Sequence, residues 1–288
     1  MKNSVRKKCC CLILNYNDAD TTAKLVGLVR NYNSFSYILV VDNKSTDNSY
    51  DRLFSLSTNK VIVIQTDKNG GYGYGNNYGI EYALKKLGCN YVLIANPDVL
   101  FEDSCVSAML DLLKKDGSVG VAAPTQLDIH RNIIPERAWK IPSSFRYALT
   151  FTSRGMKLAN THYDSKYFSS DVVEVDCVPG AMLMVNASIF IAIGGYDTDM
   201  FLYCEEDTIG YKIKSKGFKT CLLTKDVYIH EHGISISKSI KSVEKQRRLI
   251  NKNKILFMKK YLKANIFEVC IARILGEKEI LRIKIRGI

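Results

Sequence analysis

Four apolar segments in the first hundred residues most restrict the fold that this chain can adopt. They cover residues 9–14, 37–41, 61–65 and 91–95, and helix-forming stretches separate them. Four strands that alternate with three helices predict a parallel, doubly wound sheet. The expected fold class is therefore α/β, with a central, mostly parallel sheet that is flanked by helices.

Each of these segments is followed at its carboxyl end by polar residues. The residues at the four ends are Asn15, Asp42, Asp67 and Asp98. Right-handed connections bring the carboxyl ends of parallel strands to one edge of the sheet, where open α/β sheets bind ligands. We therefore expect a ligand site at this edge.

The fourth segment stops abruptly at Asn96-Pro97-Asp98. Proline has no N–H for a strand ladder and disfavours a helical conformation at the residue before it. Asp98 is thus expected at the end of a buried strand, close to the amide of Asn96. A carboxylate in that place suits a divalent cation that also touches a phosphate.

A glycine-rich segment, residues 69–79, follows the third apolar segment. It contains Gly71-x-Gly73 without a glycine three residues further on, so it is not a dinucleotide-binding fingerprint. It is either a flexible turn or a loop whose backbone approaches a nucleotide-sugar, with Asn76 and Asn77 at the start of a helix over residues 76–87. We favour the loop that binds the nucleotide-sugar.

Two other polar groups each allow a structural and a functional interpretation. Asp42 and Asn43 form either a turn after a strand or a group that accepts the imide N–H of uracil or thymine. Glu205-Glu206-Asp207 is either the solvated first turn of a helix or the source of a general base. The apolar run before these acids favours a position at the rim of something buried.

His230 and His232 follow a strand that we expect over residues 219–223. A pair of structural or surface histidines is one interpretation. The other is a neutral imidazole that completes a metal site begun by Asp98.

The positive charge of the chain is concentrated at its end. Residues 236–288 hold 15 Lys and Arg against four Asp and Glu, which places +11 of the net charge of +12 in the last 53 residues. Apolar residues accompany the lysines in a helix expected over residues 242–261, and a second helix is expected over residues 266–275. A basic amphipathic tail is typical of an anionic membrane surface. No nucleic-acid-binding pattern is present, so we expect no nucleic-acid partner.

Nine cysteines without a CxxC pair predict buried free thiols in a reducing cytoplasm. No stretch has the length that spans a bilayer, and we expect no export by a signal of this sequence. Residues 125–170 are irregular and are expected to form a loop-rich insert that serves as an acceptor lid.

Eight motifs occur in a fixed order over about residues 9–235, and together they resemble the inverting family 2 glycosyltransferases. The resemblance is to the branch that includes bacterial rhamnosyltransferases of O-antigen and cell-wall assembly. The motifs are Leu14-Asn15-Tyr16-Asn17, Val40-Val41-Asp42-Asn43-Lys44-Ser45-Thr46-Asp47, residues 69–79, Asn96-Pro97-Asp98, Gly180-Ala181, Gly194-Gly195-Tyr196-Asp197, Phe201-Leu202-Tyr203-Cys204-Glu205-Glu206-Asp207 and His230-x-x-Gly233-x-Ser235.

The resemblance implies a glycosyltransferase A-type fold, a nucleotide-sugar donor and a divalent cation, Mg²⁺ or Mn²⁺. Asp98 matches the last Asp of the family's DxD motif, and Asn96 replaces the first. Asp42 matches the residue that recognises the base, Asn15 lines the same pocket, and His230 matches the late histidine near the metal. The residues that the resemblance and the sheet edge assign to the donor are Asn15, Asp42, Asn43, Gly70, Gly71, Asn76, Asn77 and Asn96.

The catalytic base is expected in the acidic triplet. The branch shows a Phe-x-Tyr-x-Glu-Asp-x-Asp pattern, on which Glu205 falls on the Glu and Glu206 on the first Asp, while Thr208 replaces the second Asp. A shift by one residue makes Glu206-Asp207 the acidic pair instead. We expect Glu206 to be the base, with Asp207 as second choice.

The resemblance and the charge distribution predict a catalytic domain at residues 1–235 and a basic helical tail at residues 236–288. The implied enzyme transfers a sugar, first rhamnose from dTDP-rhamnose and otherwise a hexose from a UDP donor. Its acceptor is a lipid-linked oligosaccharide or polysaccharide at the inner face of the cytoplasmic membrane, in bacterial surface polysaccharide synthesis. A nucleotide-sugar or nucleic-acid binding protein without catalysis is the alternative, and it has no use for a base at Glu206.

Overall fold

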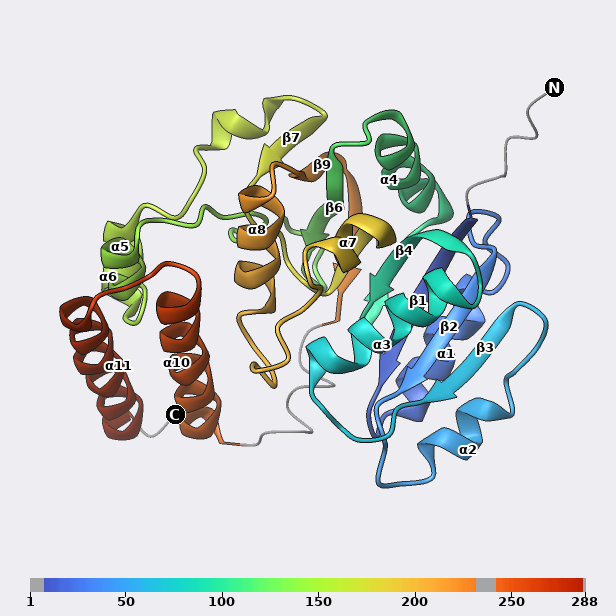
Figure 1. Ribbon diagram of the computed structural model, residues 1–288, viewed down its shortest axis with the longest axis horizontal. Helices are drawn as coiled ribbons and strands as arrows, with labels where there is room; N and C mark the ends of the chain where they lie inside the picture. The colour runs from blue at the N-terminus through green and yellow to red at the C-terminus, as the bar shows by residue number, and fades with distance from the viewer. Residues whose placement is uncertain (1–7, 232–241, 287–288) are drawn as a thin grey trace.

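The expected α/β sheet forms the centre of the molecule, and helices cover both of its faces (Figure 1). The structure, a computed structural model, describes residues 8–231 and 242–286. His232, Gly233 and Ser235 of the last motif lie outside the described residues. The strands are β1 (Lys8–Asn15), β2 (Tyr37–Asp42), β3 (Val61–Gln65), β4 (Cys89–Ala95), β5 (Val99–Leu100), β6 (Val119–Leu127), β7 (Val172–Val175), β8 (Met182–Asn186) and β9 (Lys219–His230).

Within the described residues these strands form one mixed sheet in the order β3-β2-β1-β4-β8-β6-β9-β5, and β7 pairs with β9. The four strands expected from the sequence, β1 to β4, are mutually parallel, which confirms the fold class. β8 is antiparallel to both β4 and β6, and β5 and β7 are antiparallel to β9.

Two helical layers enclose the sheet because both of its faces are apolar. Leu25, Leu53 and Met109, from α1, α2 and α4, belong to the core on one face. Ile80 and Phe190, from α3 and α7, belong to the core on the other face together with α8. The helices are α1 (Ala19–Val29), α2 (Ser49–Phe54), α3 (Tyr72–Lys85), α4 (Asp103–Lys115), α5 (Ser144–Leu149), α6 (Ser153–Ala159), α7 (Ala187–Ala192), α8 (Glu205–Ser215), α10 (Val243–Lys260) and α11 (Ile266–Arg286).

The start of α3 corrects the prediction for the glycine-rich segment. α3 begins at Tyr72, so Asn76 and Asn77 lie in its second turn instead of at its start. Gly75 and Gly79 are inside the helix, where a Cβ atom would overlap the side chains of Leu14 and Leu12. These two glycines therefore serve the close packing of α3 on β1.

β9 is much longer than the strand expected over residues 219–223. It pairs with β6 along two stretches, with a register irregularity between Pro124 and Thr125, and it ends at His230. At that end it pairs with β5, so that Val99 lies opposite His230. The extra length of β9 carries His230 to the end of β4.

The insert over residues 125–170 contains α5, α6 and a 3₁₀ helix at Ser165–Ser169, in addition to loops. The prediction of a loop-rich segment was therefore wrong for these short helices. Tyr147 and Ala148 of α5, and Phe151 just after it, are buried against the C-terminal helices.

The apolar residues of α10 pack inward, which corrects the interpretation that they form a membrane-facing side. Phe257 and Met258 are fully buried in a third core with Met200 and α5, and α11 adds Ala272 to it. Ser242 caps α10 by accepting the Lys245 N–H at 3.4 Å. The second tail helix runs to Arg286, far beyond the expected residue 275. The domain division at residue 235 stays a prediction.

Two other sequence expectations concern cysteines and membrane spans. All nine cysteines are free thiols, and Cys270 alone among them is exposed, so the expectation of buried thiols holds for the other eight, which are buried or partly buried. None of the helices in the described ranges has both the length and the apolar character that crossing a bilayer requires.

The backbone at Gly71 provides a test of the fold. Its φ of +90° with ψ of −178° is open to glycine only, and a Cβ atom there would overlap the Phe201 carbonyl oxygen. We expect Gly71→Ala to lower the free energy of unfolding by about 2 kcal/mol or more, measured by urea denaturation. Gly117→Ala is the control, because a Cβ atom there meets no neighbour; equal stability of the two variants would contradict this packing.

Candidate active site

Asp98 and His230 meet at the carboxyl edge of the sheet. Asp98 Oδ1 lies 3.2 Å from His230 Nε2, and both side chains are buried. The Glu231 N–H donates to the Asp98 carbonyl oxygen at 2.9 Å, which fixes the end of β9 beside the Asn96-Pro97-Asp98 turn. The two residues that the resemblance assigns to the metal are thus brought together although 132 positions separate them.

A buried polar chain continues behind His230. Gln126 Nε2 is 3.4 Å from His230 Nδ1, and the Tyr228 hydroxyl donates to Gln126 Oε1 at 2.8 Å. A hydrogen bond at one imidazole nitrogen orients the ring and decides what the other nitrogen offers. Gln126 was not expected from the sequence, because nothing local marks it as a neighbour of His230.

This pair fits a divalent cation of the Mg²⁺ or Mn²⁺ type. One carboxylate oxygen and one imidazole nitrogen share a buried position at the sheet edge. No third His, Cys, Asp or Glu completes a cluster with them within residues 8–231 and 242–286. Such cations use one or two protein ligands together with substrate phosphates and water, so two side chains are a sufficient protein share.

Asn15 and Asp42 lie side by side at the ends of β1 and β2. Asn15 Nδ2 donates to Asp42 Oδ1 at 2.8 Å, and the amides of Ser45 and Gln65 donate to Asp42 Oδ2 at 3.0 and 2.9 Å. Thr22 donates to Asn15 Oδ1 at 2.9 Å. Asp42 is fully buried, so a uracil or thymine N–H would have to replace one of these donors. Its role in base binding stays a prediction.

Asn43 holds the loop that precedes α3. Its Nδ2 donates to the Gly71 carbonyl oxygen and to Asn69 Oδ1, both at 3.0 Å. The Gly71 N–H donates to the same Asn69 oxygen at 3.1 Å. Gly70 and Gly71 are therefore fixed next to the ends of β2 and β3, at the expected edge of the sheet.

Asn76 and Asn77 face protein groups. Asn76 is fully buried and donates to the Tyr72 carbonyl oxygen at 3.1 Å. Asn77 exchanges two hydrogen bonds with the backbone of Tyr196, at 2.8 and 3.0 Å. Their assignment to the donor stays a prediction, and Asn77 clearly orders the loop of Tyr196.

Glu205 and Glu206 form the first turn of α8. Burial, followed by the negative charge of Glu206, raises the pKa of Glu205 to about 8. Burial also raises the pKa of Glu206, whose Oε1 accepts the Gly180 N–H at 3.3 Å. Two adjacent carboxyl groups in a buried place do not both ionise readily, so the pair retains a proton near neutral pH.

Asp207 has a different environment from the two glutamates. Its Oδ1 accepts the indole N–H of Trp139 at 2.8 Å, and its Oδ2 accepts the Tyr147 hydroxyl. Burial, followed by the charge of Asp207, raises the pKa of Tyr147 well above its usual range. Asp207 thus connects α8 to the insert through two side-chain donors, whereas Glu206 accepts the Gly180 N–H.

The segment before α8 makes a left-handed turn at two non-glycine residues, Tyr203 and Cys204, with φ of 75° and 69°. Such a conformation costs about 1–3 kcal/mol per residue and persists when its surroundings hold it. Asn253 of α10 is buried and donates to the carbonyl oxygens of Leu202 and Tyr203, at 2.7 and 3.3 Å. A residue of the C-terminal helix therefore stabilises the turn that presents Glu205 and Glu206.

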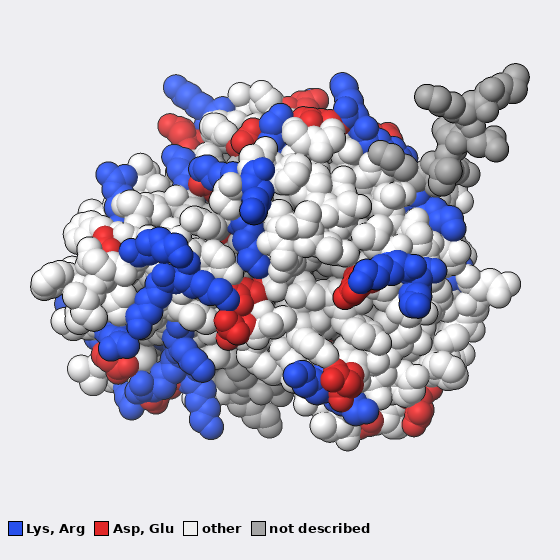
Figure 2. All heavy atoms as spheres, viewed as in Figure 1, with Lys and Arg blue, Asp and Glu red and all other residues white. Residues whose placement is uncertain are grey.

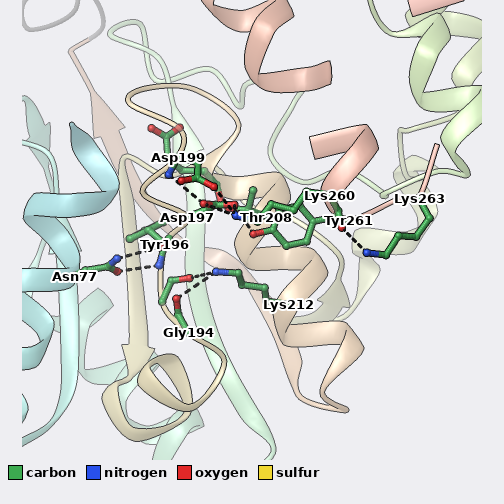
Figure 3. A network of polar contacts seen from close by, with 12 residues as sticks. Asn77, Gly194, Tyr196, Asp197, Asp199, Thr208, Lys212, Lys260, Tyr261 and Lys263 are labelled. Carbon is green, nitrogen blue, oxygen red and sulfur yellow. Dashed lines mark hydrogen bonds and ion pairs between the residues drawn. The ribbon is translucent and has the colours of Figure 1, made fainter. Parts of the chain in front are cut away.

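A second contact from α10 holds the neighbouring loop (Figure 3). Lys260 Nζ lies 2.8 Å from Asp197 Oδ2 and 2.8 Å from Asp199 Oδ2. The Tyr261 hydroxyl donates to Asp197 Oδ2 at 2.6 Å. Lys260 and the Tyr261 hydroxyl, together with the Asp199 N–H, lower the pKa of Asp197 although its burial opposes this. Lys212 of α8 donates to the Gly195 carbonyl oxygen at 2.6 Å, so the loop is tied to two helices.

Two cavities adjoin this region. A void of about 10 Å³, enough for about one water molecule, borders Glu205 and Glu206. Glu205 Oε1 has no hydrogen-bond partner among the described residues. The insert borders a larger, open cavity of about 490 Å³, and Asp176 lines both this cavity and the small void. The larger cavity is lined by Lys140, Ile141, Pro142, Ser143, Arg146, Asn160, Tyr163, Asp176 and Lys214.

The fold and the polar carboxyl edge of its sheet define a GT-A-type glycosyltransferase. The chain belongs to the family described as Glycosyl transferase family 2, whose sequence profile matches residues 10–175. A solved structure described as GalNAc-T7 with UDP, GalNAc and Mn²⁺ superposes with a TM-score of 0.60 at 16% identity, over 80% of this chain and 44% of that one. At this identity the likeness shows the fold alone.

Two curated proteins are similar in sequence. An N-acetylglucosaminyl-diphospho-decaprenol L-rhamnosyltransferase of Mycobacterium tuberculosis is 25% identical over 203 residues, which are 67% of this chain and 66% of the relative. The Low-salt glycan biosynthesis hexosyltransferase Agl10 of Haloferax volcanii is 26% identical over 205 residues, 70% of this chain and 60% of the relative. The chain thus spans somewhat less than two thirds of the length of these relatives.

The raised pKa of Glu205 predicts how stability changes with pH. The unfolded chain releases this proton near pH 4.5, and the folded protein keeps it until about pH 8. Between these values the folded state binds the extra proton, so stability falls as pH rises. We expect Glu205→Gln to reduce this fall, measured as urea unfolding between pH 5 and 8, in the range that the two pKa values define. An unchanged pH dependence would contradict the buried, protonated state of Glu205.

The role of Asn253 predicts a stability loss without a change of charge. Asn253→Ala leaves two backbone oxygens without their donor, and we expect the free energy of unfolding to fall by about 1–3 kcal/mol. Lys252→Ala, at the exposed neighbouring position, should stay within about 0.5 kcal/mol. Urea denaturation compares the two variants, and an equal effect would show that Asn253 does not hold the turn.

Proposed function

We propose that the protein is an inverting glycosyltransferase that moves a sugar from a nucleotide-diphosphate donor to an acceptor hydroxyl. One observation carries this proposal: the Gly180-Ala181 segment links the two halves of the candidate site. The Asn96 N–H donates to the Ala181 carbonyl oxygen at 2.8 Å, and the Gly180 N–H donates to Glu206 at 3.3 Å. Two consecutive residues, Gly180 and Ala181, therefore connect the Asn96-Pro97-Asp98 turn to the acidic start of α8 by hydrogen bonds.

In this proposal Glu206 is the base. It takes the proton from the acceptor hydroxyl while the hydroxyl oxygen attacks the anomeric carbon. The bond from that carbon to the donor diphosphate breaks, and the nucleoside diphosphate leaves with the electron pair. A single displacement inverts the anomeric centre. The choice of Glu206 over Asp207 is supported by the two hydrogen bonds that occupy Asp207, from Trp139 and Tyr147.

Glu205 supports this role by keeping its own proton. With a pKa of about 8 it is mostly neutral at pH 7, so a single negative charge is left on the pair for Glu206. Asp98 and His230 would hold the Mg²⁺ or Mn²⁺ ion. Such an ion, when bound, stabilises negative charge on the leaving diphosphate.

The donor that we propose first is dTDP-rhamnose, with UDP-hexoses as second choice. The mycobacterial relative is named a rhamnosyltransferase, which supports rhamnose. The haloarchaeal relative is named a hexosyltransferase, and a fold neighbour was crystallised with UDP, which supports the second choice. Asp42 and Asn43, with Asn15 and the loop of Gly70 and Gly71, are the proposed donor-binding groups.

The acceptor that we propose is a lipid-linked oligosaccharide at the inner face of the cytoplasmic membrane. Support comes from the mycobacterial relative, whose name contains a diphospho-decaprenol acceptor. The insert, with its open cavity between Lys140 and Arg146, is the part of the chain that we propose as acceptor lid. Synthesis of a bacterial surface polysaccharide is the process in which such a transfer takes place.

Glu206→Gln tests the proposed function. Candidate dTDP- and UDP-sugars with Mg²⁺ or Mn²⁺ are first screened for a shift in melting temperature, and turnover of those that bind is then measured as release of nucleoside diphosphate. We expect Glu206→Gln to reduce turnover by about 10²–10⁴-fold, because the loss of a general base has this size, while the donor-induced shift in melting temperature remains.

The control is Glu81→Gln, which changes an exposed carboxylate of α3 that pairs with Lys85. Full turnover by Glu206→Gln would contradict the assignment of the base. Donor binding without turnover by the unmodified protein, in the presence of lipid-linked acceptors, would favour the non-catalytic binding protein instead.

A further inference from the structure

α11 has a second apolar face besides the one that it buries. Val269, Ala272 and Ile280 are buried against the rest of the protein. On the opposite side Phe267 and Ile285 are 77% exposed, Ile274 is 68% exposed and Leu281 is 58% exposed. Residues seven and four positions apart lie on the same side of a helix, so these four side chains form one stripe, in which the exposed Lys278 also lies. We call Phe267, Ile274, Leu281 and Ile285 the apolar band; it extends over about 27 Å.

α10 presents a different band to solvent. Lys245, Arg248, Lys252 and Lys259 are all exposed. They are three, four and seven positions apart, which again places them on one side of the helix. This side is opposite to Asn253 and Phe257, which are buried. We call these four residues the basic band. Figure 2 shows Lys and Arg side chains gathering over the region of α10 and α11.

Ion pairs place the two bands next to each other. Arg248 of the basic band lies 3.4 Å from Glu277, which is located between Ile274 and Leu281 on the flank of the apolar band. Glu244 lies 2.9 Å from Arg248 and 3.1 Å from Lys284 of α11. The two helices pack side by side (Figure 1) with both bands turned away from the buried core. The result is one surface with a basic and an apolar half.

We propose that this two-helix surface docks the protein on an anionic lipid bilayer. The apolar band would enter the boundary between headgroups and acyl chains, and the basic band would bind the phosphates of the headgroups. Charge complementarity favours this occupant, because residues 236–288 carry +11 of the net charge of +12. Three of the four acids in this segment, Glu244, Glu277 and Glu279, already pair with Arg248, Lys284 or Arg282.

The surface connects to the candidate active site through the opposite side of the same helix. Asn253 and Lys260 of α10 hold the turn and the loop before Glu205. Docking through the outer sides of α10 and α11 thus leaves these contacts unchanged. The inference deepens the proposed function, on which it rests in one respect: a lipid-linked acceptor requires an enzyme at the membrane.

Vesicle binding by the full chain, without donor or metal, tests the proposal. Sedimentation with phosphatidylglycerol vesicles is compared with sedimentation with phosphatidylcholine vesicles. We expect the unmodified protein to bind the anionic vesicles and to lose this binding as salt rises. The triple variant Phe267→Ser/Ile274→Ser/Leu281→Ser should bind at least about tenfold more weakly, because these side chains lose apolar area that the bilayer buries. Lys245→Glu/Lys252→Glu/Lys259→Glu should bind about 100-fold more weakly.

Two control variants change the same residue types elsewhere on the surface. Phe54→Ser/Ile129→Ser removes exposed apolar side chains, and Lys114→Glu/Lys115→Glu reverses two exposed charges on α4. Both controls should bind anionic vesicles like the unmodified protein. Circular dichroism of every variant establishes that the fold is retained.

Other occupants of the surface are outcomes that would overturn the proposal. If light scattering shows a dimer that the apolar triple variant dissociates, and vesicles are not bound, the apolar band pairs with a second copy of this chain. If the basic band is needed for binding nucleic acid and not vesicles, its partner is nucleic acid. This experiment does not measure donor turnover. A protein that fails to bind vesicles can therefore still be tested for glycosyl transfer with a water-soluble acceptor.

Discussion

The short antiparallel pairing of β5 with the end of β9 is the constraint on which the candidate site depends. It places Val99 opposite His230 and so sets His230 Nε2 3.2 Å from Asp98 Oδ1. Pro97 ends β4 just before this point, because it has no N–H to continue the ladder. Without the last residues of β9, Asp98 would stand alone at the sheet edge. With them, the chain has a buried oxygen and nitrogen pair that suits a divalent cation.

The helix α10 does not only lie next to the candidate site; it also holds parts of it in place. Asn253 donates to the backbone of the strained turn at Tyr203, and Lys260 pairs with Asp197. α10 therefore contacts the turn and the loop before Glu205 with one side and carries the basic band on the other. This arrangement explains why the apolar residues of a basic helix are buried here, and why the exposed apolar band is found on α11 instead.

Much of the fold was predictable, because continuous apolar runs leave few alternatives. The strand at Val61–Gln65 has the predicted bounds. The start of α3 was not predicted, since Gly75 looks like a loop residue until its packing on β1 is known. α11 was expected to stop before Gly276, but this glycine gives room to Asn251 of α10 and the helix continues. β9 was cut short in the prediction because polar residues follow Leu223.

The sequence identified most residues of the candidate site, but it did not identify the residues that contact and orient them. The resemblance named Asp98, His230 and Glu206. The structure brings Asp98 and His230 together and links Glu206 to the Asn96-Pro97-Asp98 turn through Gly180-Ala181, while their roles stay predictions. Gln126 and Asn253 were missed, because their partners are far away in sequence and no local pattern marks them.

The position of a bound metal ion would show whether Asp98 and His230 form the cation site. Crystals of the full chain grown with dTDP or UDP and Mn²⁺ would show the ion by its anomalous scattering. We expect a peak within about 2.1–2.2 Å of Asp98 and His230, next to the diphosphate. An ion held elsewhere, with Asp98 and His230 still hydrogen-bonded to each other, would contradict it.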